Sequence, residues 1–294
     1  MNHGIRLTRT DRIFHLIVDS ILVFILVILV IPIWSTITLS FRPNDFIGSA
    51  LEGMLLAPWK WSTAAYRALL GHRAFLTSTW NSFRIFFEGV ATALFLTVPL
   101  AYGLSIKTLP GRKILYGLVL VPYLFNVGLV PNYLLVTRLG LVDSLAAIFL
   151  PGAISVYNTL IMKSFFEGIP EELKESARID GASEFTVLLR IILPLSKPIL
   201  LTIGLYYGVH FWNDFFNAML YLNDNSLQPL PILLRNILMS SGMNEYVEVS
   251  AFGEAPIAAI KAASVFLAAI PMLVAYPFIQ RYFVKGTMLG SVKG

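Results

Sequence analysis

The stretch IPEELKESARIDGASEFTVLLRIILPLSKP, Ile169–Pro198, is the most informative part of this sequence. It gathers glutamate, aspartate, lysine and arginine residues between two strongly apolar stretches, and it ends in Leu-Pro and then Lys-Pro. Charged side chains are costly to place in hydrocarbon. The stretch therefore predicts a loop in water that joins two membrane-spanning helices.

The rest of the chain fits that prediction. Of its 294 residues, 56% are hydrophobic and only 13% are charged, whereas about 25% of the residues of an ordinary soluble domain are charged. We predict an all-α integral membrane protein with one transmembrane domain, residues 1–294, and a cytosolic loop at 163–197. Since a span needs roughly 20 apolar residues, apolar windows predict six spans, at 14–39, 85–106, 114–137, 144–162, 199–222 and 262–280.

The distribution of basic residues predicts the orientation. If the loop at 163–197 and both termini lie in the cytosol, fourteen of the 22 Lys and Arg residues lie inside and the other eight outside. Basic residues concentrate in cytoplasmic loops of membrane proteins. We therefore expect a multi-pass protein of a cell membrane with both termini in the cytosol. The net charge of +5 reports this orientation and gives no reason to expect a nucleic-acid partner.

Turn and cap residues subdivide the charged loop. Pro170 fits the first position of a helix, and acidic residues follow it at the positive end of the helix dipole. Gly181 fits a left-handed C-terminal cap, so the pattern predicts a short helix over 170–180. Ser183 is placed to cap a second helix, which Pro194 is expected to end or bend.

These positions resemble a known signature. The pattern Glu175-Ser176-Ala177, three residues, Gly181, nine residues, then Ile-Ile-Leu-Pro ending at Pro194 is similar to the EAA motif of permease subunits of ABC importers. That motif reads E-A-A, three residues, G, nine residues, I-x-L-P, and serine in place of the middle residue is its one departure here. The resemblance implies a six-span permease fold. It also implies that the short helix is a coupling helix seated in a cleft of a cytosolic ATPase.

The resemblance assigns ATPase coupling to specific positions: Glu175, Ser176, Ala177, Arg178, Asp180, Gly181, Leu193 and Pro194. For Arg178 and Asp180 a local salt bridge is an equally good interpretation. For the whole segment the alternative is a solvated loop without a coupling function, whose charges only keep it out of the bilayer.

A narrower resemblance concerns the substrate. The sequence NDFF at 213–216 and the tail IQRYFVKGTMLGSVKG at 279–294 resemble the carbohydrate subclass, as the second permease of a maltose-type pair for oligosaccharides. This implies a heterodimer with a second permease, two ABC ATPase subunits and an extracellular sugar-binding protein, in a bacterial cell membrane. The chain has no Walker pattern, so we expect no enzyme activity and no cofactor in it; ATP and Mg would be bound by the ATPase partners.

Polar residues in the predicted fifth span are candidates for the substrate pathway: His210, Trp212, Asn213 and Asp214. Ionisable groups within spans mark pathways by default, and aromatic rings beside amides suit sugars. Equally, Asp214 would cap or pair with a helix, and Trp212 would anchor at the interface. The histidines have no ligand-like spacing, so no metal site is expected.

Three other function classes remain open from the sequence. An ABC permease for amino acids, peptides or polyamines would share the coupling loop. An ion-coupled secondary transporter would need no ATPase, but the spans are poor in carboxylates and we find no internal repeat. A membrane scaffold would need no coupling helix.

Overall fold

The computed structural model describes residues 9–46, 49–125, 127–239 and 255–288, and every regular element within these ranges is a helix. The predicted all-α class is confirmed. The chain divides into two compact units, which are treated separately below. Unit 1 comprises Met1–His72 and Ile237–Leu267, and unit 2 comprises Arg73–Asn236 and Ala268–Gly294.

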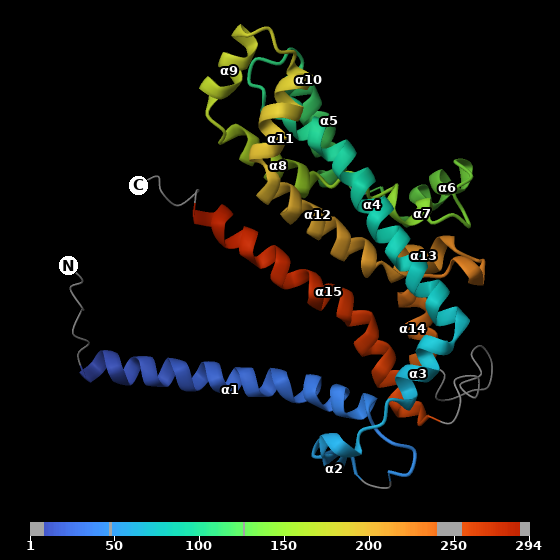
Figure 1. Cartoon of the computed structure of the whole chain (residues 1–294). Coiled ribbons are helices and arrows are strands. Elements are labelled where there is room, and N and C mark those ends of the chain that lie inside the picture. Colours follow the sequence, from blue (N-terminus) through green and yellow to red (C-terminus); the bar gives the residue numbers. More distant parts are fainter. Residues whose placement is uncertain (1–8, 47–48, 126, 240–254, 289–294) are drawn as a thin grey trace. The chain divides into compact units, whose positions relative to one another are not determined.

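Unit 1 begins with the long helix α1, Arg9–Ser40 (Figure 1). It is followed by α2, Ala50–Met54, a 3-10 turn at Pro58–Lys60, and α3, Ala64–Gly71. Trp34 Nε1 donates a hydrogen bond to the Met54 carbonyl oxygen at 3.1 Å, and the Ser40 and Tyr66 hydroxyls lie 2.6 Å apart. These contacts tie the short helices to the end of α1.

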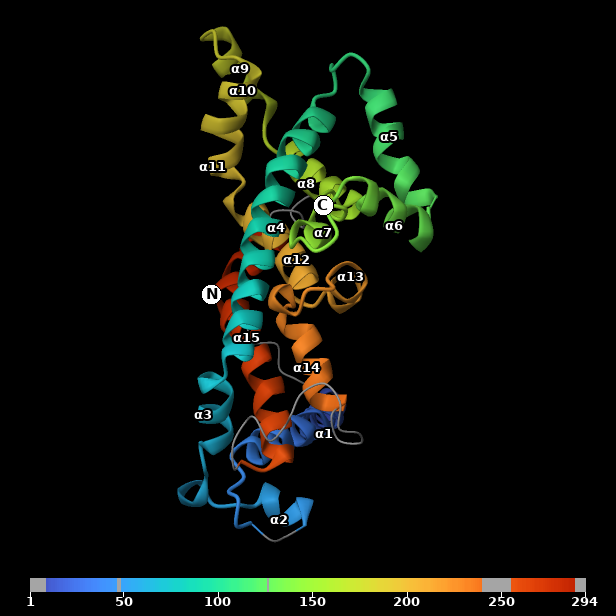
Figure 2. The ribbon, with the colours of Figure 1, turned by 90° about the vertical axis from the view of Figure 1, so that its right-hand side faces the viewer.

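Unit 2 is organised around α4, Arg73–Ser105, which runs beside α12, Lys197–Trp212, in both views (Figures 1 and 2). A third helix, α8, also packs against α4. The elements of unit 2 besides α4 and α12 are α5 (Arg112–Leu124), α6 (Leu129–Arg138), α7 (Ala146–Phe149), α8 (Val156–Glu167), α9 (Glu171–Ile179), α10 (Glu184–Val187), α11 (Leu193–Leu195), α13 (Phe215–Tyr221), most of α14 (Leu230–Met239) and the last part of α15 (Ile257–Met288).

Two glycines allow α4 and α12 to approach closely. A Cβ at Gly89 would lie 2.7 Å from the Phe211 ring, and one at Gly208 would overlap the Phe86 ring. Small residues are the usual means of close helix packing in membranes, where no hydrophobic force drives helices together. A buried hydrogen bond of 2.8 Å between the Thr97 and Tyr207 hydroxyls joins the same two helices.

The helices agree with the predicted spans in part. Ile13–Ser40, Arg73–Ser105 and Ile257–Pro277 are each long and apolar enough to cross a membrane, and they account for the first, second and sixth spans. Two bent pairs, Arg112–Leu124 with Leu129–Arg138 and Glu184–Leu195 with Lys197–Trp212, raise the number to five within the described residues. The predicted count of six single helices is thus not confirmed.

The predicted fourth and fifth spans differ most from the helices. Over 144–162 the chain forms α7, then a turn at Pro151 and Gly152, then α8. Proline lacks an N–H and clashes with the preceding turn, so it stops the helix there. Over 199–222 the helix α12 ends at Trp212, and Asp214 begins α13. Apolar windows measure the composition of a segment, and they do not detect such breaks in the backbone.

Candidate functional site

The predicted short helix of the charged loop is α9, Glu171–Ile179, and its boundaries confirm the prediction to within one residue. Pro170 occupies the N-cap instead of the first helical position. At the other end, Gly181 has φ +80°, and its N–H donates to the Arg178 carbonyl oxygen, while the Ala182 N–H donates to that of Ala177. This pair of bonds is the Schellman cap, which requires the left-handed conformation that glycine adopts at least cost.

The second predicted helix begins at Ser183, whose Oγ accepts a hydrogen bond from the Thr186 N–H at 3.3 Å. It continues through α10, a π-helical turn at Leu188–Ile192 and α11. Pro194 does not end it, because in the π turn the Leu193 N–H bonds back to Leu188, which relaxes the backbone where proline cannot donate. The sharp bend, 84°, comes after Leu195.

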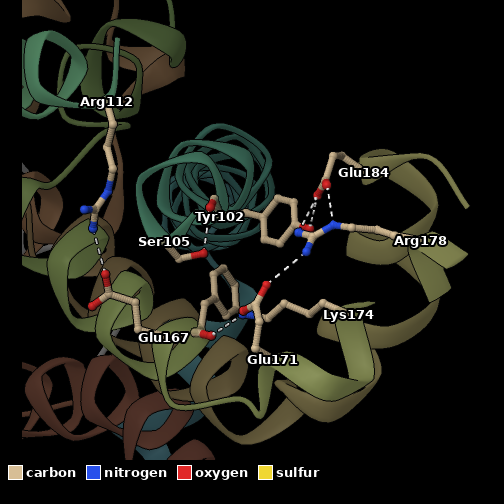
Figure 3. Close-up of polar contacts among 9 residues, drawn as sticks. Tyr102, Ser105, Arg112, Glu167, Glu171, Lys174, Arg178 and Glu184 are labelled. Carbon is tan, nitrogen blue, oxygen red and sulfur yellow. Dashed lines mark hydrogen bonds and ion pairs between the residues drawn. The ribbon is translucent and has the colours of Figure 1, made fainter. Parts of the chain in front are cut away.

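Ion pairs connect the two helices of the loop (Figure 3). Arg178 Nε donates to Glu184 at 2.7 Å and Arg178 Nη1 donates to Glu171 at 2.9 Å. The Lys174 ammonium, which is buried, lies 2.9 Å from Glu171 and also donates to the Phe166 carbonyl oxygen. Of the two alternatives for Arg178, the structure therefore has the local salt bridges.

These bonds lower the pKa values of the two carboxyl groups and raise that of the guanidinium, so they favour the charged form of each. The hydrogen bond from Lys174 is the largest influence that lowers the pKa of Glu171, and the bond from Arg178 does the same for Glu184. In return, Glu184 and then Glu171 raise the pKa of Arg178. Glu171, Glu184 and Arg178 therefore stay charged at neutral pH.

The same end of unit 2 ties the loop to the helices around it. The Tyr102 hydroxyl, near the end of α4, donates to Glu184 at 2.6 Å. At the start of α5, Arg112 donates to the Leu104 carbonyl oxygen and to Glu167 of α8, each at 2.8 Å. Figure 3 shows the Tyr102 ring pointing from α4 toward the Glu184–Arg178 pair. Side chains from four segments of the sequence thus meet at one end of α4.

The remaining predicted coupling residues separate into two groups. The Ser176 hydroxyl donates to the Glu172 carbonyl oxygen of its own helix, and Ala177 and Leu193 pack against the core. Glu175 and Asp180 are exposed, as is Pro194, and no ion pair to either carboxylate occurs within the described residues. Those two carboxylates remain available to a partner.

Apolar side chains of the loop are exposed beside them. Ile179 is 86% exposed, Phe185 68% and Leu173 46%. We call Leu173, Ile179 and Phe185 the exposed apolar triplet. Exposed apolar patches mark sites of interaction with other proteins or with membranes.

The predicted substrate-pathway residues do not form one site. Trp212 is buried, packs edge-on against the Phe83 ring at 5.2 Å and donates to the Ala268 carbonyl oxygen. Asp214 accepts from the backbone and side-chain amides of Asn217, which makes it the N-cap of α13. Asn213 is exposed, and its amide donates to the Val209 carbonyl oxygen. Of the four, His210 lines a cavity in unit 2, and the other three are not among the residues that line it.

That cavity is a cleft of about 680 Å³ lined by the start of α8, the second half of α12 and Tyr276 of α15. Its aromatic rings are Tyr157, Tyr206, Tyr207, Tyr276 and His210. The Tyr207 hydroxyl is occupied, because it accepts from the Ser155 N–H at 2.8 Å. Asn158 lines the cleft as well.

Sequence reasoning missed residues of both regions. Tyr102, Glu171, Lys174 and Glu184 lie outside the EAA pattern, although the two acids and the lysine stand within one charged loop. Tyr157, Asn158, Tyr206 and Tyr276 belong to three apolar stretches, and no spacing rule in the sequence connects them.

Comparison with known proteins gives consistent matches along the chain. The model of the family described as "Binding-protein-dependent transport system inner membrane component" matches residues 7–288. The chain is 40% identical over 286 residues to the polygalacturonan/rhamnogalacturonan transport system permease protein YtcP of Bacillus subtilis (strain 168), with 97% of this chain and 99% of the relative covered. Protein LplC of the same organism is 38% identical, with 99% of both chains covered.

A third relative and a solved structure extend the likeness. The arabinooligosaccharides transport system permease protein AraQ of Halalkalibacterium halodurans is 29% identical, with 92% of this chain and 94% of the relative covered. A chain of a bacterial ABC transporter involved in the import of the acidic polysaccharide alginate superposes with a TM-score of 0.85 and 28% identity, covering 94% of this chain and 98% of that one. Sequence and fold therefore agree over nearly the full length.

Proposed function

Since the chain belongs to the family of inner membrane components of binding-protein-dependent transport systems, we propose that it is a permease subunit of an ATP-driven importer of carbohydrate, most closely of an oligosaccharide. The relatives described above with a named substrate are named for saccharides. The alternatives of amino acid, peptide or polyamine import and of ion-coupled transport have no such support.

The observation that carries the proposal is the surface formed around Gly181. The Schellman cap turns α9 back toward α10, and the exposed apolar triplet and the carboxylates of Glu175 and Asp180 are each exposed on the two helices that this turn joins or at the turn itself. Because the chain has no Walker pattern, energy has to arrive through a contact with another protein. A cytosolic ATPase subunit suits this surface, and its basic side chains or backbone amides would meet the carboxylates.

The coupling function divides between outward and inward side chains. Glu175, Asp180 and the exposed apolar triplet would contact the ATPase, while Arg178 and Glu184 carry the movement of α9 to Tyr102 and so to α4. Closure of the ATPase pair on ATP would then bias the permease between its inward-open and outward-open states. Each state binds its partners with a different affinity, which is the requirement for a population shift.

The proposed assembly contains this chain, a second and different permease subunit, two ATPase subunits that bind ATP and Mg, and an extracellular sugar-binding protein. Both termini and the loop at 163–197 would lie in the cytosol of a bacterial cell. The tail at 279–294, which carries part of the carbohydrate resemblance, lies partly outside the described residues, and its side chains lie outside them altogether.

The test is purification of the assembled complex from cells that express the chain with its neighbouring transport genes, followed by ATPase assays in lipid. We expect an ATPase and a second permease to copurify, and hydrolysis to rise when the binding protein carries a saccharide. Gly181→Val should keep assembly but reduce this stimulation. A side chain there meets nothing within 4 Å, so the cost, about 1–2 kcal/mol or more, falls on the backbone turn alone.

Gly140→Val is the matched control, because Gly140 also has positive φ, +67°, and open space around its Cα, but it lies outside the coupling loop. Equal loss of stimulation in both variants would speak against the coupling function. A chain that purifies alone and transports a substrate down an ion gradient without ATP would overturn the proposal altogether.

A further inference from the structure

The cleft in unit 2 combines features that the coupling function does not use. The Tyr157 and Tyr276 rings are 60% and 61% exposed, and Tyr206 is 38% exposed, within a cavity of about 680 Å³. No hydrogen bond within the described residues involves the hydroxyls of these three tyrosines. If these tyrosines only faced lipid, there would be no reason for them to line one cavity. Their arrangement around one cavity indicates a ligand.

Asn158 supplies the second, independent observation. Its side chain is only 6% exposed and lines the cleft, yet no hydrogen bond within the described residues reaches its amide group. Its backbone N–H, by contrast, is bonded to the Ser155 hydroxyl, which caps α8. The amide atoms are not among the fully buried polar atoms that lack a partner, so they reach the surface of the cleft. The Asn158 amide is therefore free to donate to and accept from a polar ligand in the cleft.

The depth of the cleft suits a transport pathway. Tyr206 lies nine residues and His210 thirteen residues along α12 from Lys197, which is roughly 14 and 20 Å at 1.5 Å per residue. Asn158 lies nine residues from Glu167, the last residue of α8, at the end of unit 2 where Glu167 meets Arg112. If Lys197 and Glu167 lie at the cytosolic boundary of a hydrocarbon core of about 30 Å, as the predicted topology has it, the cleft lies near the middle of that core.

We infer that this cleft is a saccharide-contact site contributed by this chain itself. The inference rests on the proposed function and goes beyond it by assigning the residues. The tyrosine rings would stack on the apolar faces of pyranose or furanose units, and Asn158 and His210 would bond their hydroxyl groups. The lining is mainly apolar with a few polar groups, and its volume falls within the range of ligand pockets. A sugar chain would pass through such a site with many weak contacts.

The experiment uses the complete complex in lipid with its binding protein, and oligogalacturonides and arabino-oligosaccharides as probes. Uptake and ATP hydrolysis are measured together over a range of loaded binding protein. For Asn158→Leu we expect about a tenfold lower uptake per ATP, because a sugar hydroxyl then faces a buried apolar group. Tyr206→Ala with Tyr276→Ala should lower uptake similarly. The corresponding phenylalanine variants keep the rings and should recover most of it.

Tyr123→Ala is the matched control. Tyr123 is a tyrosine of α5 that is 66% exposed and does not line the cleft, so its loss should leave uptake per ATP unchanged. Basal ATP hydrolysis and recovery of the second permease should also be unchanged in this control variant.

Different failures have different meanings. If no saccharide stimulates the wild-type complex, the proposed function fails. If the wild type imports a saccharide and the Asn158 and tyrosine variants do so equally well, the cleft inference is wrong while the proposed function stands. If these variants lose the second permease on purification, the cleft is an interface between permeases, and the inference is overturned in that case too.

Discussion

The Tyr102 hydroxyl donates a hydrogen bond of 2.6 Å to a carboxylate oxygen of Glu184, although the two residues are 82 positions apart. Tyr102 belongs to α4, which packs along most of unit 2, and Glu184 belongs to the first turn of α10, beside α9. Because Glu184 also holds Arg178, this bond joins the coupling loop to a long helix of the transmembrane domain. It is the most direct polar connection between them within the described residues.

Tyr102→Phe should therefore weaken coupling without harming assembly. The change removes one hydrogen bond to a carboxylate, which is worth about 1 kcal/mol once the half-exposed position of Glu184 is allowed for. We expect uptake per ATP to fall several-fold while basal hydrolysis is maintained, as measured in the lipid-reconstituted complex. Tyr123→Phe, at an exposed tyrosine of α5, serves as the control. Unchanged uptake per ATP in Tyr102→Phe would exclude this bond from coupling.

Acid should loosen the coupling loop before it unfolds the transmembrane helices. Glu171 and Glu184 have pKa values below their ordinary value of 4.5 because they accept hydrogen bonds from Lys174 and Arg178. A carboxyl with a lowered folded pKa stabilises the fold above its unfolded pKa, and this contribution is lost as the pH falls through the folded value. We expect the protection of the amides in 169–190, measured relative to their intrinsic exchange rate at each pH, to fall as the pH is lowered below the ordinary glutamate value of 4.5. A variant with glutamine at both positions should exchange fast at neutral pH and show little further change on acidification.

The close approach of α4 and α12 makes Gly208 sensitive to any added side chain. Gly208→Val should destabilise the protein by about 1–3 kcal/mol, because a Cβ at this position overlaps the Phe86 ring. Thermal unfolding in detergent measures the effect. Gly117→Val controls for the change of residue type, since Gly117 is also helical but a Cβ added there would have nothing within 4 Å. Equal unfolding temperatures for the two variants would contradict the packing argument.

Asp143 should hold in place the start of the loop that follows α13, at Asn223 and Asp224. It has φ +57°, and its carboxylate accepts from the backbone N–H groups of Asn223 and Asp224, which lowers the pKa of Asp143. Asp143→Ala should accelerate hydrogen exchange at these two amides at neutral pH. Asp143→Asn keeps an acceptor oxygen and tolerates the left-handed backbone, so it should be close to wild type. If the alanine variant exchanges no faster than the asparagine variant, the carboxylate does not hold the loop.

Local chemistry explains why the helix bounds and caps within the charged loop were predicted well. Gly181 and Ser183 affect only the backbone within a few residues of themselves. Their positions therefore predict a helix cap and the start of a new helix regardless of the tertiary structure. The same local rules would have predicted a helix break at Pro151. We predicted one continuous span over 144–162 because the whole segment is apolar. The same limit explains why the sequence did not show the different surroundings of the candidate pathway residues. Trp212 and Asp214 lie two residues apart, but one packs in the core and the other caps a helix.

The sequence by itself determined that the chain is a helical membrane protein, where the short helix of the charged loop begins and ends, and that Gly181 closes that helix. Composition and caps suffice for these because they depend on transfer to lipid and on bonds between near neighbours. Only the tertiary structure decided that Arg178 bonds to Glu184 instead of remaining outward, that Tyr102 joins them, and that Tyr157, Asn158, Tyr206 and Tyr276 surround one cleft. Such contacts depend on how helices that are distant in the sequence pack against one another, and the spacing of side chains along the chain does not predict that packing.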